Sequence, residues 1–447
     1  MTSEFRSWKN AKCFRFVRHG YDPASGVARL VYAFDDGPEL TETIRFPDAP
    51  WPQSPASQAA FGRALKLLHA MAGVSYYKAS IPLGLDTAGA PPDAEMAAFL
   101  ERLYLEGLAE FAHANQVELE GRVRFRAEAP GGPPAPSLGL PGRGLVAMGG
   151  GKDSLVSLEL LRSCGLEMQA ACVGNSRLIA ETVSAAGLPL LRIGRSLAPE
   201  LAEMNRAGAL NGHVPVTGIL SCILLCAAIL YGYRYIVFSN ERSADEATLT
   251  DSRGRPVNHQ YSKGLAFERA LRSLVQAQVG ADIEYFSMLR PFSDLAIARR
   301  FSAMGQYHGV FSSCNRNFHL EGARIEGRWC GACPKCRFTT LMLAPWLAPP
   351  EVVAILGADL LDDPGQEDGF RAICRLGVAK PFECVGSVDE SRAAMRALGA
   401  LPGWRDKHVV RALAAELRDL ELPDLQALLE ARGAHCIPPE LMADVDI

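Results

Sequence analysis

A glycine-rich stretch near residue 150 combines residue types that bind phosphate groups. It consists of Gly149, Gly150, Gly151, Lys152, Asp153 and Ser154. Glycine adopts positive φ angles at no steric cost and lets a ligand approach the backbone closely. Between a buried strand and a helix start, free backbone N–H groups form an anion site. Lys152 adds a positive charge, and Asp153 and Ser154 suit either an N-cap or a metal or phosphate contact. We expect phosphate binding here, and the alternative is a plain strand-to-helix turn.

Four cysteines in the second half of the chain have the spacing of a metal site. Cys314, Cys330, Cys333 and Cys336 follow the pattern C-x15-C-x2-C-x2-C, with Gly331 in the tight turn between two of them. Four thiolates suit a closed, tetrahedral structural Zn²⁺ site. An iron–sulfur cluster uses the same ligands, and a pair of free-thiol turns is a third interpretation. We expect zinc.

Polar residues gather in loops next to apolar segments. Carboxylates after the expected strand 235–239 are suited to Mg²⁺, namely Glu241, Asp245 and Glu246, and a solvated loop is the alternative. Ligands bind at the carboxyl ends of parallel strands. We therefore expect substrate contacts from the other polar residues of these loops: Asn240, Arg242, Asn258, Gln260, Tyr261 and Arg290.

The elements that must position these residues change character along the chain. Residues 1–128 read as an N-terminal α+β domain with short antiparallel strands, and a Pro/Gly-rich segment follows at 129–144. Strand-like and helix-like runs alternate over 144–348 and end with an expected strand at 310–313, which predicts a parallel sheet covered on both faces. The region 349–447 is mostly helical by period.

The composition is that of an ordinary globular protein. The 447 residues are 48% hydrophobic and 21% charged, and the formal net charge of −4 makes no case for binding nucleic acid or an anionic membrane. No secretory signal is visible at the N-terminus, and twelve cysteines then favour reduced thiols and a cytoplasmic location. The uncharged segment 214–233 is interpreted as a buried helix, with a membrane span as the alternative. The composition leaves the oligomeric state open.

The stretch 149–154 resembles the PP-loop, Ser-Gly-Gly-x-Asp-Ser, of the ATP pyrophosphatase superfamily. Gly149 replaces the first serine, which removes a hydroxyl donor and keeps the backbone cradle. The resemblance implies an adenine nucleotide alpha hydrolase-like fold for 144–348. It also implies cleavage of ATP between its α and β phosphates, which usually yields an adenylated substrate, pyrophosphate and finally AMP. A similar cysteine cluster occurs in PP-loop enzymes that make 7-cyano-7-deazaguanine.

Further stretches resemble the bacterial PP-loop epimerases of peptidoglycan precursor synthesis. They are LVYAFDDGPELTETIRFP, MGGGKDS, NERSADEATL, VNHQYSKGLAFE, WCGACPKCRF and KPFECVGS. The resemblance implies that ATP and Mg²⁺ activate UDP-MurNAc-L-Ala-L-Glu as an acyl-adenylate and that its terminal L-glutamate is inverted. Candidates for the Cα base, by residue type alone, are His213, His259, Lys263 and Cys384, with Glu241 as a further catalytic candidate.

Other functions within the superfamily stay open at this point. One alternative is an amide- or nitrile-forming ligase like the deazaguanine enzyme, which would need ammonia or an amino donor. A tRNA-thiolating enzyme is disfavoured because no basic stripe is visible. An ATP-binding protein that has lost catalysis is the non-enzyme alternative, and Gly149 in place of serine is the feature that favours it.

Overall fold

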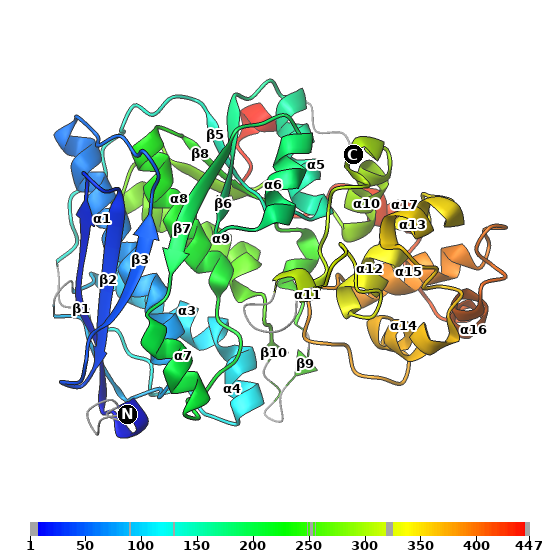
Figure 1. The fold of residues 1–447 in the computed structure, drawn as a ribbon, viewed down its shortest axis with the longest axis horizontal. Coiled ribbons are helices and arrows are strands. Elements are labelled where there is room, and N and C mark those ends of the chain that lie inside the picture. The colour runs from blue at the N-terminus through cyan, green and yellow to red at the C-terminus, as the bar shows by residue number, and fades with distance from the viewer. Residues whose placement is uncertain are drawn as a thin grey trace.

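A nine-stranded sheet forms the framework of the computed structural model, which describes residues 8–88, 91–127, 130–247, 249–250, 254, 256–318 and 325–442 (Figure 1). The strand order is β11-β8-β5-β6-β7-β3-β2-β1-β4. In chain order the strands are β1 (Cys13–Asp22), β2 (Val27–Phe34), β3 (Leu40–Arg45), β4 (Gly84–Asp86), β5 (Gly144–Ala147), β6 (Met168–Val173), β7 (Leu190–Ser196), β8 (Tyr235–Phe238) and β11 (Glu284–Ser287). A separate hairpin pairs β9 (Leu249–Thr250) with β10 (Pro256–Val257).

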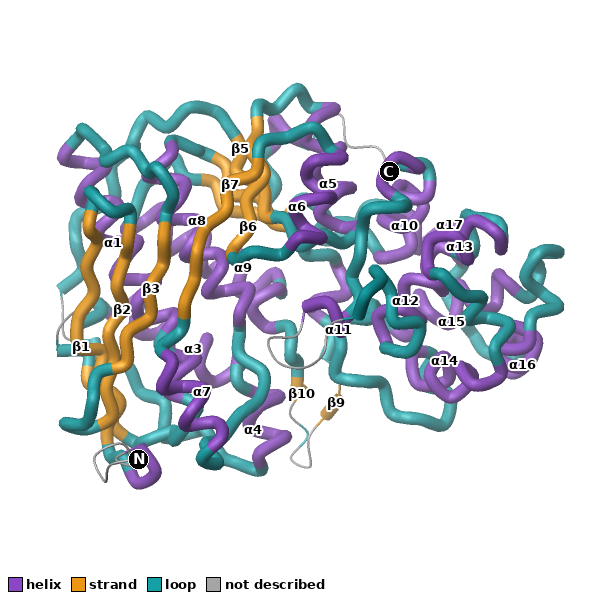
Figure 2. Tube along the Cα trace, viewed as in Figure 1, coloured by secondary structure: helices purple, strands orange, loops and turns teal. Residues whose placement is uncertain are grey.

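The sheet has a parallel half and a mostly antiparallel half. Strands β11, β8, β5, β6 and β7 pair in parallel. Strand β3 then joins β7 in antiparallel register, with Ile44 opposite Arg195, so the N-terminal strands extend the same sheet (Figure 2). The buried carboxylate of Glu42 accepts a 2.7 Å hydrogen bond from Arg195 across this junction. The sheet therefore crosses the domain boundary expected at 129–144, and the three-domain division stays a prediction.

Helices cover both faces of the parallel strands, as the alternating sequence pattern predicts. Successive strand residues point to opposite faces; Leu145 belongs to one hydrophobic core and Val146 to the other. The core on the first face includes residues of α1 (Pro55–Ala72), α3 (Ala94–Gly107), α8 (Val216–Tyr231) and α9 (Leu265–Gln278). The core on the second face includes residues of α5 (Lys152–Ser163), α6 (Arg177–Ala185), α10 (Asp294–Ser302) and α12 (Pro334–Leu343). The mixed α/β fold is confirmed.

The uncharged segment 214–233 forms α8, which is buried along nearly its whole length against the sheet. One of its few polar side chains, Ser221, is hydrogen-bonded to the hydroxyl of Tyr285 at 2.9 Å. Within the described ranges, every helix is too short or too polar to cross a membrane.

The C-terminal region is helical and packs on the second face, at the right of Figure 1. Its helices are α13 (Pro349–Leu356), α14 (Glu367–Ile373), α15 (Val388–Leu398), α16 (His408–Glu416) and α17 (Leu425–Leu429). Shorter helices elsewhere are α2 (Val74–Tyr77), α4 (Ala109–Asn115), α7 (Pro199–Arg206) and α11 (Asn315–Phe318). Two 3₁₀ turns, η2 (Arg242–Asp245) and η3 (Tyr261–Lys263), carry polar residues of the site described below.

One expected strand does not form, although its residues lie within the described ranges. Residues 310–313 form no strand, because Val310 and Phe311 donate their backbone N–H groups back to Tyr307 in a local turn. The N–H of Ser312 instead donates to the carbonyl oxygen of Gly150 at 2.9 Å. The segment thus supports the glycine-rich loop and does not extend the sheet.

Candidate active site

The glycine-rich stretch forms the loop between β5 and the first turn of α5. Gly150 has a φ of +81°, which favours glycine over every residue with a side chain. Gly151 is the N-cap of α5, and no side chain caps this helix end. The hydroxyl of Ser154 donates to the carbonyl of Gly151 at 3.1 Å, so neither Ser154 nor Asp153 takes the expected capping role. The loop therefore leaves backbone donors at the helix N-terminus, as an anion site requires.

Lys152 lies buried behind this loop between two carboxylates. Its ammonium group donates to Asp153 and, at 3.2 Å, to Asp294 at the start of α10. Burial alone would lower the pKa of Lys152, but the charges of Asp153 and Asp294 raise it above the ordinary value. Lys152 is therefore a fixed cation beside the loop. The hydroxyl of Ser293 caps α10 by accepting the N–H of Ala296 at 3.0 Å.

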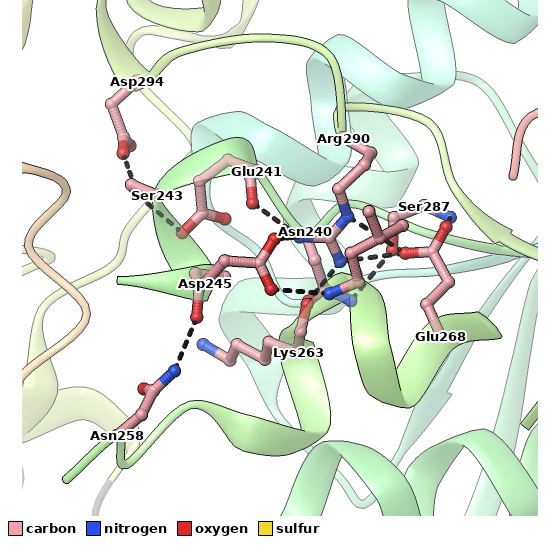
Figure 3. A network of polar contacts seen from close by, with 12 residues as sticks. Asn240, Glu241, Ser243, Asp245, Asn258, Lys263, Glu268, Ser287, Arg290 and Asp294 are labelled. Atoms are coloured by element: carbon pink, nitrogen blue, oxygen red, sulfur yellow. Dashed lines mark hydrogen bonds and ion pairs between the residues drawn. The ribbon is translucent and has the colours of Figure 1, made fainter. Parts of the chain in front are cut away.

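Glu241 joins this cluster from the carboxyl end of β8 (Figure 3). It is only 9% exposed, and Ser243 bridges it to Asp294 with hydrogen bonds of 3.4 and 2.9 Å. Burial, and then the nearby charge of Asp294, raises the pKa of Glu241 to about 7. The other two expected magnesium ligands lie differently: Asp245 accepts the N–H of Leu265 at the start of α9, and Glu246 is exposed.

Arg290 is buried and holds the loops of the site together. Its guanidinium contacts the carboxylate of Glu268 at 2.9 and 3.2 Å. It also donates to the backbone carbonyls of Glu241, at 2.9 Å, and Lys263 (Figure 3). Arg290 therefore has a positioning role in this structure, and its expected contact with substrate stays a prediction.

The other expected substrate contacts fall into two groups. The side chain of Asn240 donates a 2.9 Å hydrogen bond to the hydroxyl of Ser287. The side chains of Arg242 and Asn258 each donate a 3.1 Å hydrogen bond to a backbone carbonyl, so all three are already engaged within the protein. Gln260 and Tyr261 are each 6% exposed, and neither Gln260 Oε1 nor the Tyr261 hydroxyl has a hydrogen-bond partner among the described residues. Buried polar atoms without partners are costly, so these two are the better placed to meet a ligand.

The four candidate bases come together, although they lie on three separate stretches of the chain. The ammonium of Lys263 donates to the thiol sulfur of Cys384 at 3.0 Å. Nε2 of His259 lies 3.7 Å from the same sulfur, and the ring of His213 lies 5.9 Å from the ring of His259, measured between centroids. The structure thus brings residues 213, 259, 263 and 384 into one cluster.

Electrostatics gives these groups distinct protonation states. Burial is the largest cause that lowers the pKa of both His213 and His259 to about 4, so both imidazoles are neutral at pH 7. Burial would raise the pKa of Cys384, but the charge of Lys263 lowers it below the ordinary thiol value. Burial would lower the pKa of Lys263, but the charges of Cys384, Glu241 and Asp153 together raise it. Lys263 therefore links this cluster electrostatically to the glycine-rich loop.

Two acids that sequence reasoning missed lie at the edge of the site. Asp294 follows the loop after β11 and carried only a weak signal, its place beyond a strand end. Glu390 lies in the first turn of α15 and accepts the N–H of Leu295 at 3.0 Å. Burial, and then Asp294, raises the pKa of Glu390 to about 8. A glutamate in the first turn of an amphipathic helix gives no sequence signal, because that position is ordinarily exposed.

The four cysteines form a compact cluster beside the glycine-rich loop. The ligand atoms of Cys314, Cys330, Cys333 and Cys336 all lie within 4.8 Å of one another. Three sulfur pairs are 3.5, 3.8 and 4.0 Å apart. Four sulfurs about 2.3 Å from one tetrahedral ion would be about 3.8 Å apart. The cluster therefore fits a single metal ion. Ser312, which supports Gly150, accepts the N–H of Cys314 at 3.2 Å.

Fold and site together define a mixed α/β protein with a polar site at the carboxyl ends of parallel strands and a four-cysteine cluster beside it. Comparison with known families is more specific. Residues 6–288 match the model of the MurL N-terminal domain, and residues 310–427 match that of the MurL C-terminal domain. The chain belongs to the MurL family.

Relatives of the chain include proteins named as UDP-N-acetyl-alpha-D-muramoyl-L-alanyl-L-glutamate epimerase. One from Xanthomonas oryzae pv. oryzae is 49% identical over 96% of this chain and 95% of its own length. Another from Salinispora tropica is 43% identical over 90% of this chain and 88% of its own length. A 7-cyano-7-deazaguanine synthase from Azoarcus sp. is 28% identical over 44% of this chain and 89% of its own length.

Proposed function

We propose that the protein uses ATP to invert the terminal L-glutamate of UDP-N-acetylmuramoyl-L-alanyl-L-glutamate. The names of its relatives support the epimerase activity. One observation supports the use of ATP: a loop suited to phosphate and a cluster suited to proton transfer lie close together in one site. The loop 149–154 offers backbone donors for phosphate, and Lys263 connects it to a cluster of groups that can move protons.

The loop between β5 and α5 is suited to ATP in the manner of a PP-loop. The uncapped end of α5 and the cation of Lys152 would hold the phosphates. Glu241, with Asp294 and Asp153 nearby, supplies the hard oxygen ligands that Mg²⁺ prefers. When bound, Mg²⁺ would neutralise phosphate charge during nucleotide cleavage. The sulfur spacings of the cysteine cluster favour structural Zn²⁺, which would hold the segment 312–314 under the loop.

ATP has a clear chemical use in this reaction. Deprotonation of glutamate at Cα beside an ionised carboxylate would place two negative charges on adjacent atoms. Transfer of AMP to that carboxylate removes the first charge and leaves an acyl group that accepts electron density. A base then removes the Cα proton, a proton returns on the other face, and water releases AMP and the D-glutamyl product. Pyrophosphate leaves against the positive end of α5.

The ligase alternative has one observation in its favour. The chain is similar to a deazaguanine synthase over 44% of its length. An amide- or nitrile-forming enzyme would consume ammonia or an amino donor, whereas the epimerase consumes none. Dependence of ATP turnover on ammonia therefore separates the two functions.

The decisive experiment is turnover of the dipeptide nucleotide in deuterated water. With ATP and Mg²⁺, the protein should form the D-glutamyl product with deuterium at the glutamyl Cα, together with AMP and pyrophosphate. Without ATP, no exchange should occur at that carbon, because the ionised carboxylate opposes carbanion formation. Exchange without ATP would exclude activation by adenylation. ATP hydrolysis that requires ammonia, with no D-glutamyl product, would reject the epimerase itself.

A further inference from the structure

The segment 379–387, between α14 and α15, delivers Cys384 to the site from the C-terminal region. Lys380 at its start donates to the carbonyl of Gly386 near its end, which closes the segment into a loop. Gly386 has a φ of +55°, and a Cβ there would lie 2.4 Å from the ring of Phe338 and 2.8 Å from the carboxylate of Asp294. This close approach requires glycine. The segment is therefore packed tightly against α12 and the start of α10.

Cys384 is half-buried and faces cations more than anions. Lys263 contacts it from η3 at 3.0 Å, and His259 contacts it from the preceding loop at 3.7 Å. Lys335 of α12 adds a second positive charge. Lys380 and Glu383 are the other charged groups near it on its own segment. An ammonium group that donates to a sulfur favours the thiolate form over the thiol.

The distance between Cys384 and His259 decides how the two groups can act. Two groups that exchange protons with opposite faces of one carbon each lie about 3 to 3.5 Å from it, so they are about 6 to 7 Å apart. The sulfur and Nε2 are 3.7 Å apart. Substrate carbon therefore does not fit between them, and both groups must lie on the same face of it.

We propose that Cys384 is the catalytic base that removes the glutamyl Cα proton. Lys263 stabilises its thiolate and His259 carries its proton away, both from the same face of the substrate. This rests on the proposed epimerase function. The thiolate takes the proton, so an S–H bond forms as the Cα–H bond breaks and its electron pair passes into the activated acyl group. Water supplies the proton to the opposite face. The thiol then gives its proton to solvent by way of His259 on the same face, which restores the ion pair with Lys263, and a proton from solvent neutralises the hydroxide left on the opposite face.

The first test measures the thiolate directly and needs no substrate. Iodoacetamide labelling of the intact protein, followed residue by residue by mass spectrometry across pH, should label Cys384 at least about tenfold faster than Cys13 at pH 7. Cys13 is a matched half-buried thiol whose pKa is raised by burial and by Asp86. Lys263→Met should move the Cys384 labelling profile to higher pH, and Lys263→Arg should restore it. Equal rates for Cys384 and Cys13, or a profile insensitive to Lys263→Met, would overturn the ion pair.

The second test separates proton transfer from activation. Cys384→Ala and Cys384→Ser should lower ATP-dependent Cα–H exchange in deuterated water by at least about 100-fold. Exchange of radiolabelled pyrophosphate into ATP, which reports adenylation, should fall by less than about tenfold. His259→Gln should slow Cα–H exchange and leave pyrophosphate exchange near its starting rate. Cα–H exchange that survives in the Cys384 variants would overturn the proposal, and so would equal loss of both exchanges. If the unaltered protein forms no D-glutamyl product, the proposed function itself fails, whatever the variants do.

Discussion

The Arg290–Glu268 pair offers a sharp test of how the site is held together. Both side chains are almost completely buried, at 2% and 1% exposure, and the guanidinium contacts one carboxylate oxygen at 2.9 and 3.2 Å. The perturbation is Arg290→Met, which keeps an unbranched side chain and removes the charge. Glu268 is then a buried carboxylate without its cation, and the carbonyls of Glu241 and Lys263 lose a donor.

The expected cost follows from the burial of the pair. Removal of one partner from a buried ion pair costs about 3 to 5 kcal/mol, because an uncompensated charge remains. Replacement of both partners by apolar residues is often close to neutral. Arg290→Met should therefore lower the free energy of unfolding by about 3 to 5 kcal/mol. The double variant Arg290→Met, Glu268→Leu should recover at least about 2 kcal/mol of that loss.

Urea unfolding of the two single variants and the double variant gives the coupling energy as a double-mutant cycle. Arg371→Met is the matched control, because Arg371 also pairs with a glutamate, Glu416, but at the surface. Its cost should stay below about 1 kcal/mol. If Arg290→Met lowers the free energy of unfolding no more than Arg371→Met does, the pair does not hold the site together. The same conclusion follows if the double variant recovers none of the lost free energy. Turnover should fall in Arg290→Met beyond the loss of folded protein, because the backbone of Glu241 and Lys263 is released.

Two further predictions concern the loop and the cysteine cluster. Gly150→Val should abolish ATP binding measured by calorimetry while the fold persists by circular dichroism, because valine opposes the φ of +81° that shapes the loop. Gly165→Val, which places the same strain at the far end of α5 at φ +68°, should keep ATP binding; equal loss in both variants would contradict a phosphate site. Metal analysis should find about one zinc per chain, as four thiolates around one ion imply. Cys336→Ser should reduce zinc content, whereas Cys374→Ser, at another buried cysteine outside the cluster, should not; a zinc-free native protein would refute the assignment.

Local patterns along the chain predicted most of the elements that carry the site. The buried strand expected before Gly149 is β5, and the alternating runs that follow it include β6. These patterns work because side-chain periodicity and turn chemistry depend only on neighbouring residues. The expected strand at 310–313 was wrong because the structure of this segment depends on a contact with a distant part of the chain. Its apolar composition suits a strand, but its partner is the carbonyl of Gly150, far away in the sequence.

The sequence by itself determined the α/β alternation, the glycine-rich loop at a helix start and the four-cysteine spacing, since each depends on residues close together in the chain. It proposed His213, His259, Lys263 and Cys384 by residue type alone. Only the tertiary structure decided that Lys263 and Cys384, 121 positions apart, are in contact. It also decided that Asp294 joins Lys152 and that β3 extends the sheet beside β7. Such contacts depend on how whole helices and strands pack, and packing is set by the combined shape and burial of distant segments, which no local pattern records.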